Sequence, residues 1–314
     1  MKYIYSILFV TLAATTIAQH TNFNSQRNWS LNKKEIIFGL GVTQFTGDLG
    51  GLNRIGTDYQ LVDIDLPVTK MGGIIGYRYR FHPYWATTTT LSGGMLSGDD
   101  ALTKEVIRNS RNLSFKSIFL ELNQRLEFIL FAKEKFGARY KLPGMKGMKN
   151  KNTQFYVFGG IGVMYFNPKA QNASGKYVAL RPLKTEGQGM EGGPKAYLPV
   201  TLTIPFGLGY RFGIGRMWRM GIEATYVKTF SDYIDDVSGT YYDPNKLGAP
   251  GSDAYYLSNP SQVNQQWFSP GSQRGDKQKD AYYTVNIMAY RNITYKDYAS
   301  RRKSYHWKTG RYKF

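Results

Sequence analysis

Hydrophobic and polar residues alternate along several segments of the chain. In "VTLTIPFGLGYRF" (200–212) every second residue from Val200 onward is apolar, and the residues between are Thr, Pro, Gly or Arg. In "WRMGIEATYVKTF" (218–230) the apolar series begins at Trp218 and reaches Tyr226. A period of two residues places the two series on opposite faces of a β-strand. The pattern therefore predicts strands with one apolar and one polar face.

The same alternation predicts eight strands. They span residues 35–46, 70–81, 85–96, 114–129, 154–166, 197–213, 217–230 and 281–293. Most of them reach the roughly 9–11 residues that a tilted strand needs to cross a bilayer. Pro205 lacks a backbone donor and therefore predicts a bulge or a local break in the sixth strand.

The connections between these strands alternate in length. "HPY" (82–84) and "GIGR" (213–216) are tight turns, whereas the connections after the first, third, fifth and seventh strands are long, the last covering 231–280. A soluble β-sandwich, the alternative, has no reason to sort loop lengths in this way. We therefore expect an all-β fold over residues 35–293: an eight-stranded antiparallel transmembrane β-barrel with short periplasmic turns and long extracellular loops.

The composition and the N-terminus agree with an outer-membrane location. The chain has 25 Tyr, 18 Phe and 34 Gly residues, and its mean hydropathy is negative, as is typical of strands that hide apolar residues at alternate positions. "MKYIYSILFVTLAATTIAQH" predicts a signal peptide over residues 1–18, followed by a periplasmic segment over 19–34. Because the chain has no cysteine, disulfides and cysteine-based metal or redox chemistry are excluded.

Most of the formal net charge of +19 is expected on the periplasmic face. The connection 131–153, between the fourth and fifth strands, carries seven Lys and Arg against one Glu. The stretch 291–314, which includes the predicted basic periplasmic tail 294–314, carries eight against one Asp. Together they account for 13 of the 19 net charges, whereas the extracellular connections 46–68 and 231–280 are each at −3.

Charged residues also occupy inward-facing positions of the predicted strands. These are Arg78, Arg80, Glu121, Arg125, Glu127, Arg211, Arg219 and Glu223. Eight strands leave a bore just wide enough for side chains to fill. We expect the arginines and glutamates to form ion pairs across this lumen, because an isolated buried charge is costly. A plugged barrel is the favoured hypothesis, a proton or ion path the other, and a porin is not expected.

The sequence gives little support for an enzyme, and no cofactor is expected. The three histidines, His20, His82 and His306, follow the signal peptide, lie in a periplasmic turn and lie in the tail, so none belongs to an outer-face catalytic set. An Asp–Asp or Ser-based site remains open.

One extracellular stretch, "SDYIDDVSGTYYDPN" (231–245), contains four aspartates that are candidate calcium ligands through their carboxylate oxygens. They are Asp232, Asp235, Asp236 and Asp243. The spacing is not that of an EF-hand, and a solvated acidic loop is the alternative.

The basic periplasmic residues are candidates for docking a partner by charge. They are Lys133, Lys135, Arg139, Lys141, Lys146, Lys149, Lys151, Arg301, Arg302, Lys303 and Arg311. Nucleic acid is not expected as a partner, since an exported chain does not meet it in the periplasm. Acidic protein surfaces and outer-membrane lipid are within reach.

Five stretches of the chain resemble the PorG family. They are "NLSFKSIFLELNQRLEF" (112–128), "YVFGGIGVMYFNPKA" (156–170), "LRPLKTEGQG" (180–189), "IPFGLGYRF" (204–212) and "KTFSDYIDDVSGTYYDP" (228–244). The family comprises small outer-membrane β-barrels of the type IX secretion system, which exports adhesins, proteases and gliding-motility proteins. The resemblance implies an accessory structural barrel that contacts the periplasmic ring of the lipoprotein PorK and its partner PorN. An adhesin-like barrel that binds an external ligand is the alternative, and an outer-membrane enzyme is a further one.

Overall fold

The computed structural model describes residues 29, 32–49, 66–103, 105–133, 153–214, 217–276 and 278–294. Within these residues nine strands form one sheet: β1 (Lys34–Thr46), β2 (Lys70–Arg80), β3 (Trp85–Asp99), β4 (Ser114–Lys133), β5 (Thr153–Gln171), β6 (Tyr177–Ala179), β7 (Val200–Gly213), β8 (Trp218–Thr229) and β9 (Ala281–Asn292). The predicted signal peptide (1–18), most of the segment 19–34 and all of the tail 294–314 except Thr294 lie outside the described residues.

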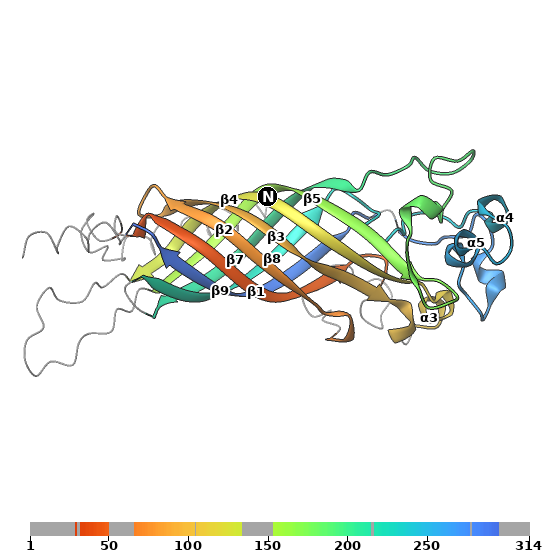
Figure 1. Cartoon of the computed structure of the whole chain (residues 1–314), viewed down its shortest axis with the longest axis horizontal. Coiled ribbons are helices and arrows are strands. Elements are labelled where there is room, and N and C mark those ends of the chain that lie inside the picture. The colour runs from red at the N-terminus through yellow and green to blue at the C-terminus, as the bar shows by residue number, and fades with distance from the viewer. Residues whose placement is uncertain are drawn as a thin grey trace, which may run out of the picture.

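Eight of these strands close into an antiparallel barrel (Figure 1). Each long strand pairs with its neighbour in the chain, and β5 pairs with β7. β1 closes the circle by pairing with β9 from Glu35↔Asn292 to Thr46↔Ala281. The three-residue β6 pairs with β5 beyond the point where β7 begins. The predicted eight-stranded barrel is therefore confirmed.

Two strands are longer than the alternation predicts. β5 continues to Gln171, and β4 continues to Lys133 after an irregularity in its pairing between Ile129 and Phe131. The first residues assigned to the basic insertion 131–153 therefore belong to the wall of the barrel, because Phe131 regains a partner in Phe155. β7 starts at Val200, directly after Pro199, rather than at residue 197.

Pro205 interrupts the sheet on one side only. The β5–β7 ladder lacks pairs between Gly159↔Phe206 and Gly162↔Thr203, and the register is the same on both sides of the gap. On the other side, Pro205 pairs with Val227 in an unbroken β7–β8 ladder. The predicted local break is confirmed, and no bulge accompanies it.

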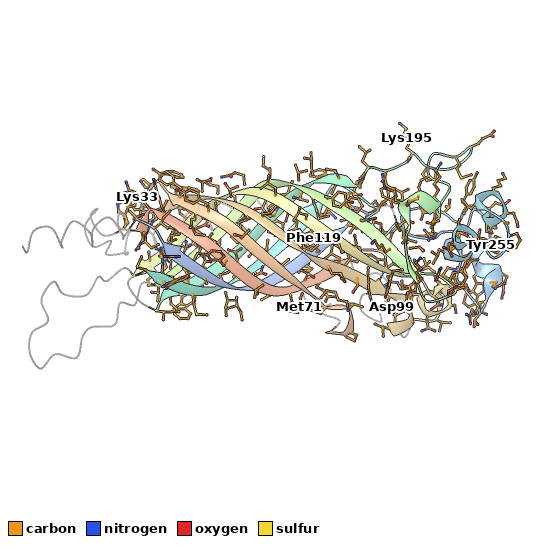
Figure 2. The ribbon with its side chains drawn as sticks, in the orientation of Figure 1. Lys33, Met71, Asp99, Phe119, Lys195 and Tyr255 are labelled. Atoms are coloured by element: carbon orange, nitrogen blue, oxygen red, sulfur yellow. The ribbon has the colours of Figure 1, made fainter. Side chains whose placement is uncertain are left out.

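The outer surface of the barrel is apolar. On β7 the outward series from Val200 to Phe212 is exposed at every position, and Leu202 retains 61 % of its accessible surface. Side chains such as Met71 project outward along the barrel wall (Figure 2). A closed antiparallel barrel with an apolar exterior and polar interior is the form in which strands cross a bilayer. The chain is therefore an outer-membrane protein.

The long loops fold together at one end of the barrel, and the short turn 81–84 lies at the other, with the end of β7 and the start of β8 (Figure 1). The loops contain η2 (Leu66–Val68), η3 (Asp100–Leu102), α3 (Val106–Arg111), η4 (Arg181–Leu183), α4 (Pro244–Leu247), α5 (Asp253–Ser258) and η5 (Gln265–Phe268). We call the described residues of these loops the extracellular cap. Its core joins Leu49, Ile234 and Val237 to wall residues such as Phe115 and Phe166. No helix among the described residues is both long and apolar enough to cross a membrane.

Candidate functional site

The lumen of the barrel holds a network of buried charges. All eight inward residues named from the sequence lie in it, each at most 3 % exposed. A ninth, Glu35 of β1, is fully buried among three arginines. It accepts from Arg78 Nη1 at 2.9 Å and from Arg219 Nη2, and Arg211 Nη1 lies 3.8 Å away. Glu35 therefore links β1 to β2, β7 and β8.

Glu127 of β4 is the second carboxylate of this network. It lies between two guanidiniums: Arg78 Nε donates to it at 2.7 Å and Arg211 Nη2 at 3.0 Å. The hydroxyl of Thr88 also donates to it. Arg211 in turn donates to Gln154 at 2.7 Å. Glu127 therefore adds β4 to the strands that are cross-linked by charge.

A third group centres on Glu223 of β8. Arg125 Nη1 and the Tyr156 hydroxyl donate to its two oxygens at 2.6 and 2.7 Å. The hydroxyls of Tyr156 and Tyr290 are 2.8 Å apart. The Tyr156 ring also lies 4.3 Å from the guanidinium carbon of Arg211. Aromatic rings thus fill the space between the two sets of ion pairs.

Two of the inward residues have other partners. Glu121 forms no ion pair in the described structure; hydroxyls of Thr203 and Tyr282 donate to it at 2.6 and 2.8 Å instead. The prediction that Glu121 forms an ion pair is therefore wrong, because the polar groups opposite Glu121 at this height are hydroxyls. Arg80 donates to the carbonyl of Pro83 in the periplasmic turn at 2.5 Å.

Little space is left between these side chains. A cavity of about 20 Å³ beside Glu121, Asn123 and Arg125 has room for about one water molecule. The network joins strands on opposite sides of the barrel and blocks the bore with guanidinium and phenol groups. This arrangement supports the plugged barrel over the solute path.

Residue-by-residue reasoning missed Glu35, Tyr156 and Tyr290. The signal for Glu35 is present in the first strand, where exposed Phe38 and Leu40 place the odd-numbered residues inward. The two tyrosines have the same inward parity, but a phenol in a Tyr-rich chain does not reveal its partner.

The four aspartates of the calcium hypothesis do not converge. Asp236 accepts from the hydroxyls of Thr185 and Tyr197, and Asp232 accepts from Ser238. Asp235 accepts from the backbone of Val237, whereas Asp243 caps the N-terminus of α4.

Among the described residues no group of three or more His, Asp or Glu is placed to hold a metal ion, so the structure gives the calcium hypothesis no support. The loop is also not solvated: Asp235 and Asp236 are at most 1 % exposed, because the segment 185–188 and the barrel rim cover them.

Two buried ion pairs tie the loops of the cap together. Arg274 Nη1 donates to Glu186 at 3.0 Å and to the carbonyl of Asp236. Arg111 donates to both oxygens of Asp100, at 2.7 and 3.0 Å. Arg111 reaches two other loops as well, through the carbonyls of Arg274 and Asp48. All four extracellular loops are therefore connected by side chains that sequence reasoning did not single out.

Burial shifts the titration of several cap carboxyls. It raises the pKa of Asp48 to about 8 and that of Asp236 to about 6. Burial, followed by the proximity of Asp280 and Asp48, raises the pKa of Asp235 well above its usual range. The Arg274 guanidinium and the two hydroxyls that donate to Asp236 act in the opposite direction on that carboxyl. The folded cap therefore favours the protonated form of these carboxyls.

The candidate docking residues cannot be placed in this geometry. The side chains of Lys133, Lys135, Arg139, Lys141, Lys146, Lys149, Lys151, Arg301, Arg302, Lys303 and Arg311 lie outside the described part of the structure. Lys133 contributes only its backbone, as the last residue of β4. The ends of β4 and β5 at residues 133 and 153 lie on the same side as the short turns.

The fold is similar to solved outer-membrane proteins at low sequence identity. Ail, the attachment invasion locus protein of Yersinia pestis, crystallised with the heparin analogue sucrose octasulfate, is 9% identical with a TM-score of 0.33, over 82% of this chain and 97% of Ail. OprG from Pseudomonas aeruginosa is 12% identical with a TM-score of 0.31, over 82% and 92% of the two chains. A major outer-membrane protein from Thermus thermophilus is 11% identical with a TM-score of 0.31, over 82% and 98%.

No protein-family model and no curated protein matches the chain. At such identities and TM-scores the similarities add no functional argument, and the barrel assignment rests on the strand pairing itself.

Proposed function

We propose that this barrel is a structural component of a type IX secretion system that contacts a periplasmic ring of the PorK/PorN type. The observation that carries the proposal is a sealed lumen in a chain whose excess positive charge belongs to its periplasmic segments. A sealed barrel does not act as a conduit, and a protein that serves as a membrane anchor does not need an open channel. The basic segments provide a surface for an acidic protein partner on the periplasmic side.

The resemblance to the PorG family supports the same proposal. Two of the stretches that carry it, 180–189 and 228–244, contact each other in the cap. Thr185 donates to Asp236 at 2.6 Å, and Glu186 accepts from the backbone of Ser238 at 2.9 Å. The two stretches therefore form one unit of the cap, which is consistent with a shared family architecture.

A charge-reversal experiment tests the contact. All eleven docking residues are changed to glutamate, and a control for charge reversal elsewhere carries Lys195→Glu and Lys246→Glu, which are exposed on the cap (Figure 2 labels Lys195). Crosslinking and pull-down from membranes should recover the ring lipoprotein with the wild type and the control, but not with the docking variant. The wild-type contact should weaken as salt rises. Recovery of the ring with the docking variant at wild-type yield would refute the proposal.

A second candidate function is binding of an external ligand by the cap. A cavity of about 240 Å³ lies between the barrel rim and α5, lined by residues that include Leu113, Asp235, Leu257 and Arg274. Deletion of residues 244–270 distinguishes the two functions. Loss of adhesion with intact secretion would favour the external ligand, whereas intact adhesion and intact secretion would favour the anchor.

A further inference from the structure

Two lysines face each other on the outer surface of the barrel, at its extracellular end. Lys116 of β4 is the direct cross-strand partner of Lys169 of β5, and both side chains are partly exposed. Strand parity turns them outward, in the series that contains Ile118 and Tyr165, which are 56 % and 46 % exposed. Like charges directly opposite one another destabilise a pair of strands. In the isolated protein, repulsion between the two lysines therefore disfavours the pairing of β4 with β5 at this point.

An aromatic ring lies beside the pair. Lys116 Nζ is 4.6 Å from the ring centroid of Tyr177 in β6, so the amine extends across β5. β6 pairs Ala179 with Lys169. We call Lys116 and Lys169 the rim patch. Over the described part of the chain, none of the ion pairs includes a member of this patch.

The rim patch borders the surface that faces lipid. Below it, the outward positions Leu120 and Leu122 of β4 and Val163 of β5 are apolar and about half exposed. Above it, the loops leave the wall and enter the cap. The cations therefore lie on the flank of the barrel, at the height where the headgroups of the outer leaflet meet the protein.

We propose that the rim patch binds the phosphate group of an outer-leaflet lipid. A phosphate has the opposite charge and several acceptor oxygens, so it can bond to both lysine amines at once and cancel their repulsion. Basic residues at a membrane surface attract anionic headgroups, and the exposed Tyr177 is the kind of residue found at that interface. A soluble acidic ligand fits less well, because the lysines point to the side of the barrel rather than to the top of the cap.

The stability of two variants in two lipids tests this proposal. The full chain is folded into phosphatidylcholine nanodiscs containing either bisphosphorylated lipid A or its dephosphorylated form. The test variant is Lys116→Gln/Lys169→Gln, and the matched control is Lys195→Gln/Lys246→Gln, two exposed cap lysines outside the patch. The thermal unfolding midpoint is measured in each lipid, and lipid retention is measured by native mass spectrometry.

The proposal expects the order of stability to reverse between the lipids. With dephosphorylated lipid the test variant should be the more stable, because the lysine repulsion is gone. With bisphosphorylated lipid the wild type should be the more stable, and the test variant should retain the lipid at least about tenfold less well. The control should follow the wild type in both lipids. A test variant with the same order of stability in both lipids, or displacement of the lipid by millimolar inorganic phosphate alone, would overturn it.

Discussion

Glu35 is the residue on which the lumen network depends most. It faces arginines from three other strands, and its side chain has no contact with solvent. Buried ion pairs contribute little net stability when complete, but removing one partner leaves the other charges buried and uncompensated. The asymmetry makes single substitutions here informative.

Glu35→Gln should destabilise the barrel by about 3–5 kcal/mol, because three guanidiniums then share one carboxylate fewer. Urea unfolding in lipid bilayers, followed by tryptophan fluorescence, measures the change. The control is Glu191→Gln on the exposed cap surface, which should stay within about 0.5 kcal/mol of the wild type. Equal midpoints for Glu35→Gln and wild type would mean that the network does not hold the wall together.

Asp235→Asn should stabilise the cap at neutral and higher pH. The pKa of Asp235 is raised in the folded protein, so the folded state binds more protons than the unfolded state above the ordinary carboxyl range. Stability therefore falls as pH rises through that window. Asparagine removes the buried charge and keeps the oxygen that accepts from Val237 at 3.0 Å. The gain should be at least about 1 kcal/mol at pH 8 and vanish near pH 4.

Amide exchange in residues 230–276 measures this effect. The ratio of variant to wild-type rates at each pH removes the intrinsic pH dependence of exchange. Asp243→Asn is the control, since asparagine caps a helix as well as aspartate does. A pH-independent ratio for Asp235→Asn would contradict the assignment of a buried, titrating carboxyl.

The sequence predicts the direction of a side chain better than its partner. Alternation alone places eight charged residues inside the barrel, because a closed wall allows only two directions. It does not say that Glu121 meets hydroxyls of Thr203 and Tyr282, since that depends on the relative height of distant strands. Asp236 is buried by a contact with Thr185, which is 51 residues away in the chain. The local sequence does not show this contact, and an acidic stretch considered alone is expected to be solvated.

The closing seam between β1 and β9 is sensitive to backbone spacing. A Cβ on Gly41 would lie 2.1 Å from the carbonyl oxygen of Val285, a backbone atom of the partner strand. A Cβ on Gly159 of β5 would instead lie in open space. The two glycines therefore differ in whether the fold requires them.

Gly41→Val should prevent most of the chain from closing, because the strands must separate to admit the side chain. Gly159→Val should fold as the wild type does, within about 0.5 kcal/mol. The fraction of heat-modifiable, fast-migrating protein on a gel reports barrel closure. Similar fractions for both variants would show that the seam tolerates a wider spacing than the structure has.

β9 already has both of its partners before the chain reaches the basic tail. It pairs with β8 and β1 and ends at Asn292. A chain truncated after Thr294 should therefore still insert as a folded barrel, while its recovery of the periplasmic ring should fall several-fold under the proposed function. Cell fractionation and the same gel assay measure insertion. Loss of insertion would instead show that residues 295–314 contribute to assembly of the barrel.

The ends of strands can be predicted where apolar and polar residues alternate regularly. The prediction fails where strand pairing continues beyond the regular alternation. β4 extends through Lys133 because β5 offers it a partner beyond an irregularity, which the sequence of β4 alone does not show. The local break at Pro205 was predictable, because a residue without a backbone donor interrupts the hydrogen bonding of any sheet.

The molecule as a whole combines a blocked lumen with a folded cap. Charged and aromatic side chains from β1, β2, β4, β5, β7, β8 and β9 meet inside it. Purified protein in planar bilayers should show no stepwise conductance, whereas a porin inserted under the same conditions should. Repeated steps of constant size would require an opening of the network and would favour the ion-path hypothesis.

The reach of Arg111 has a consequence for the order of events during biogenesis. Its guanidinium bonds to loops that lie before it and far after it in the chain, up to Arg274. The cap can therefore be completed only when the final hairpin is in place. A barrel without this hairpin leaves the guanidinium of Arg111 without its acceptor at Arg274. A finished cap therefore requires a finished barrel.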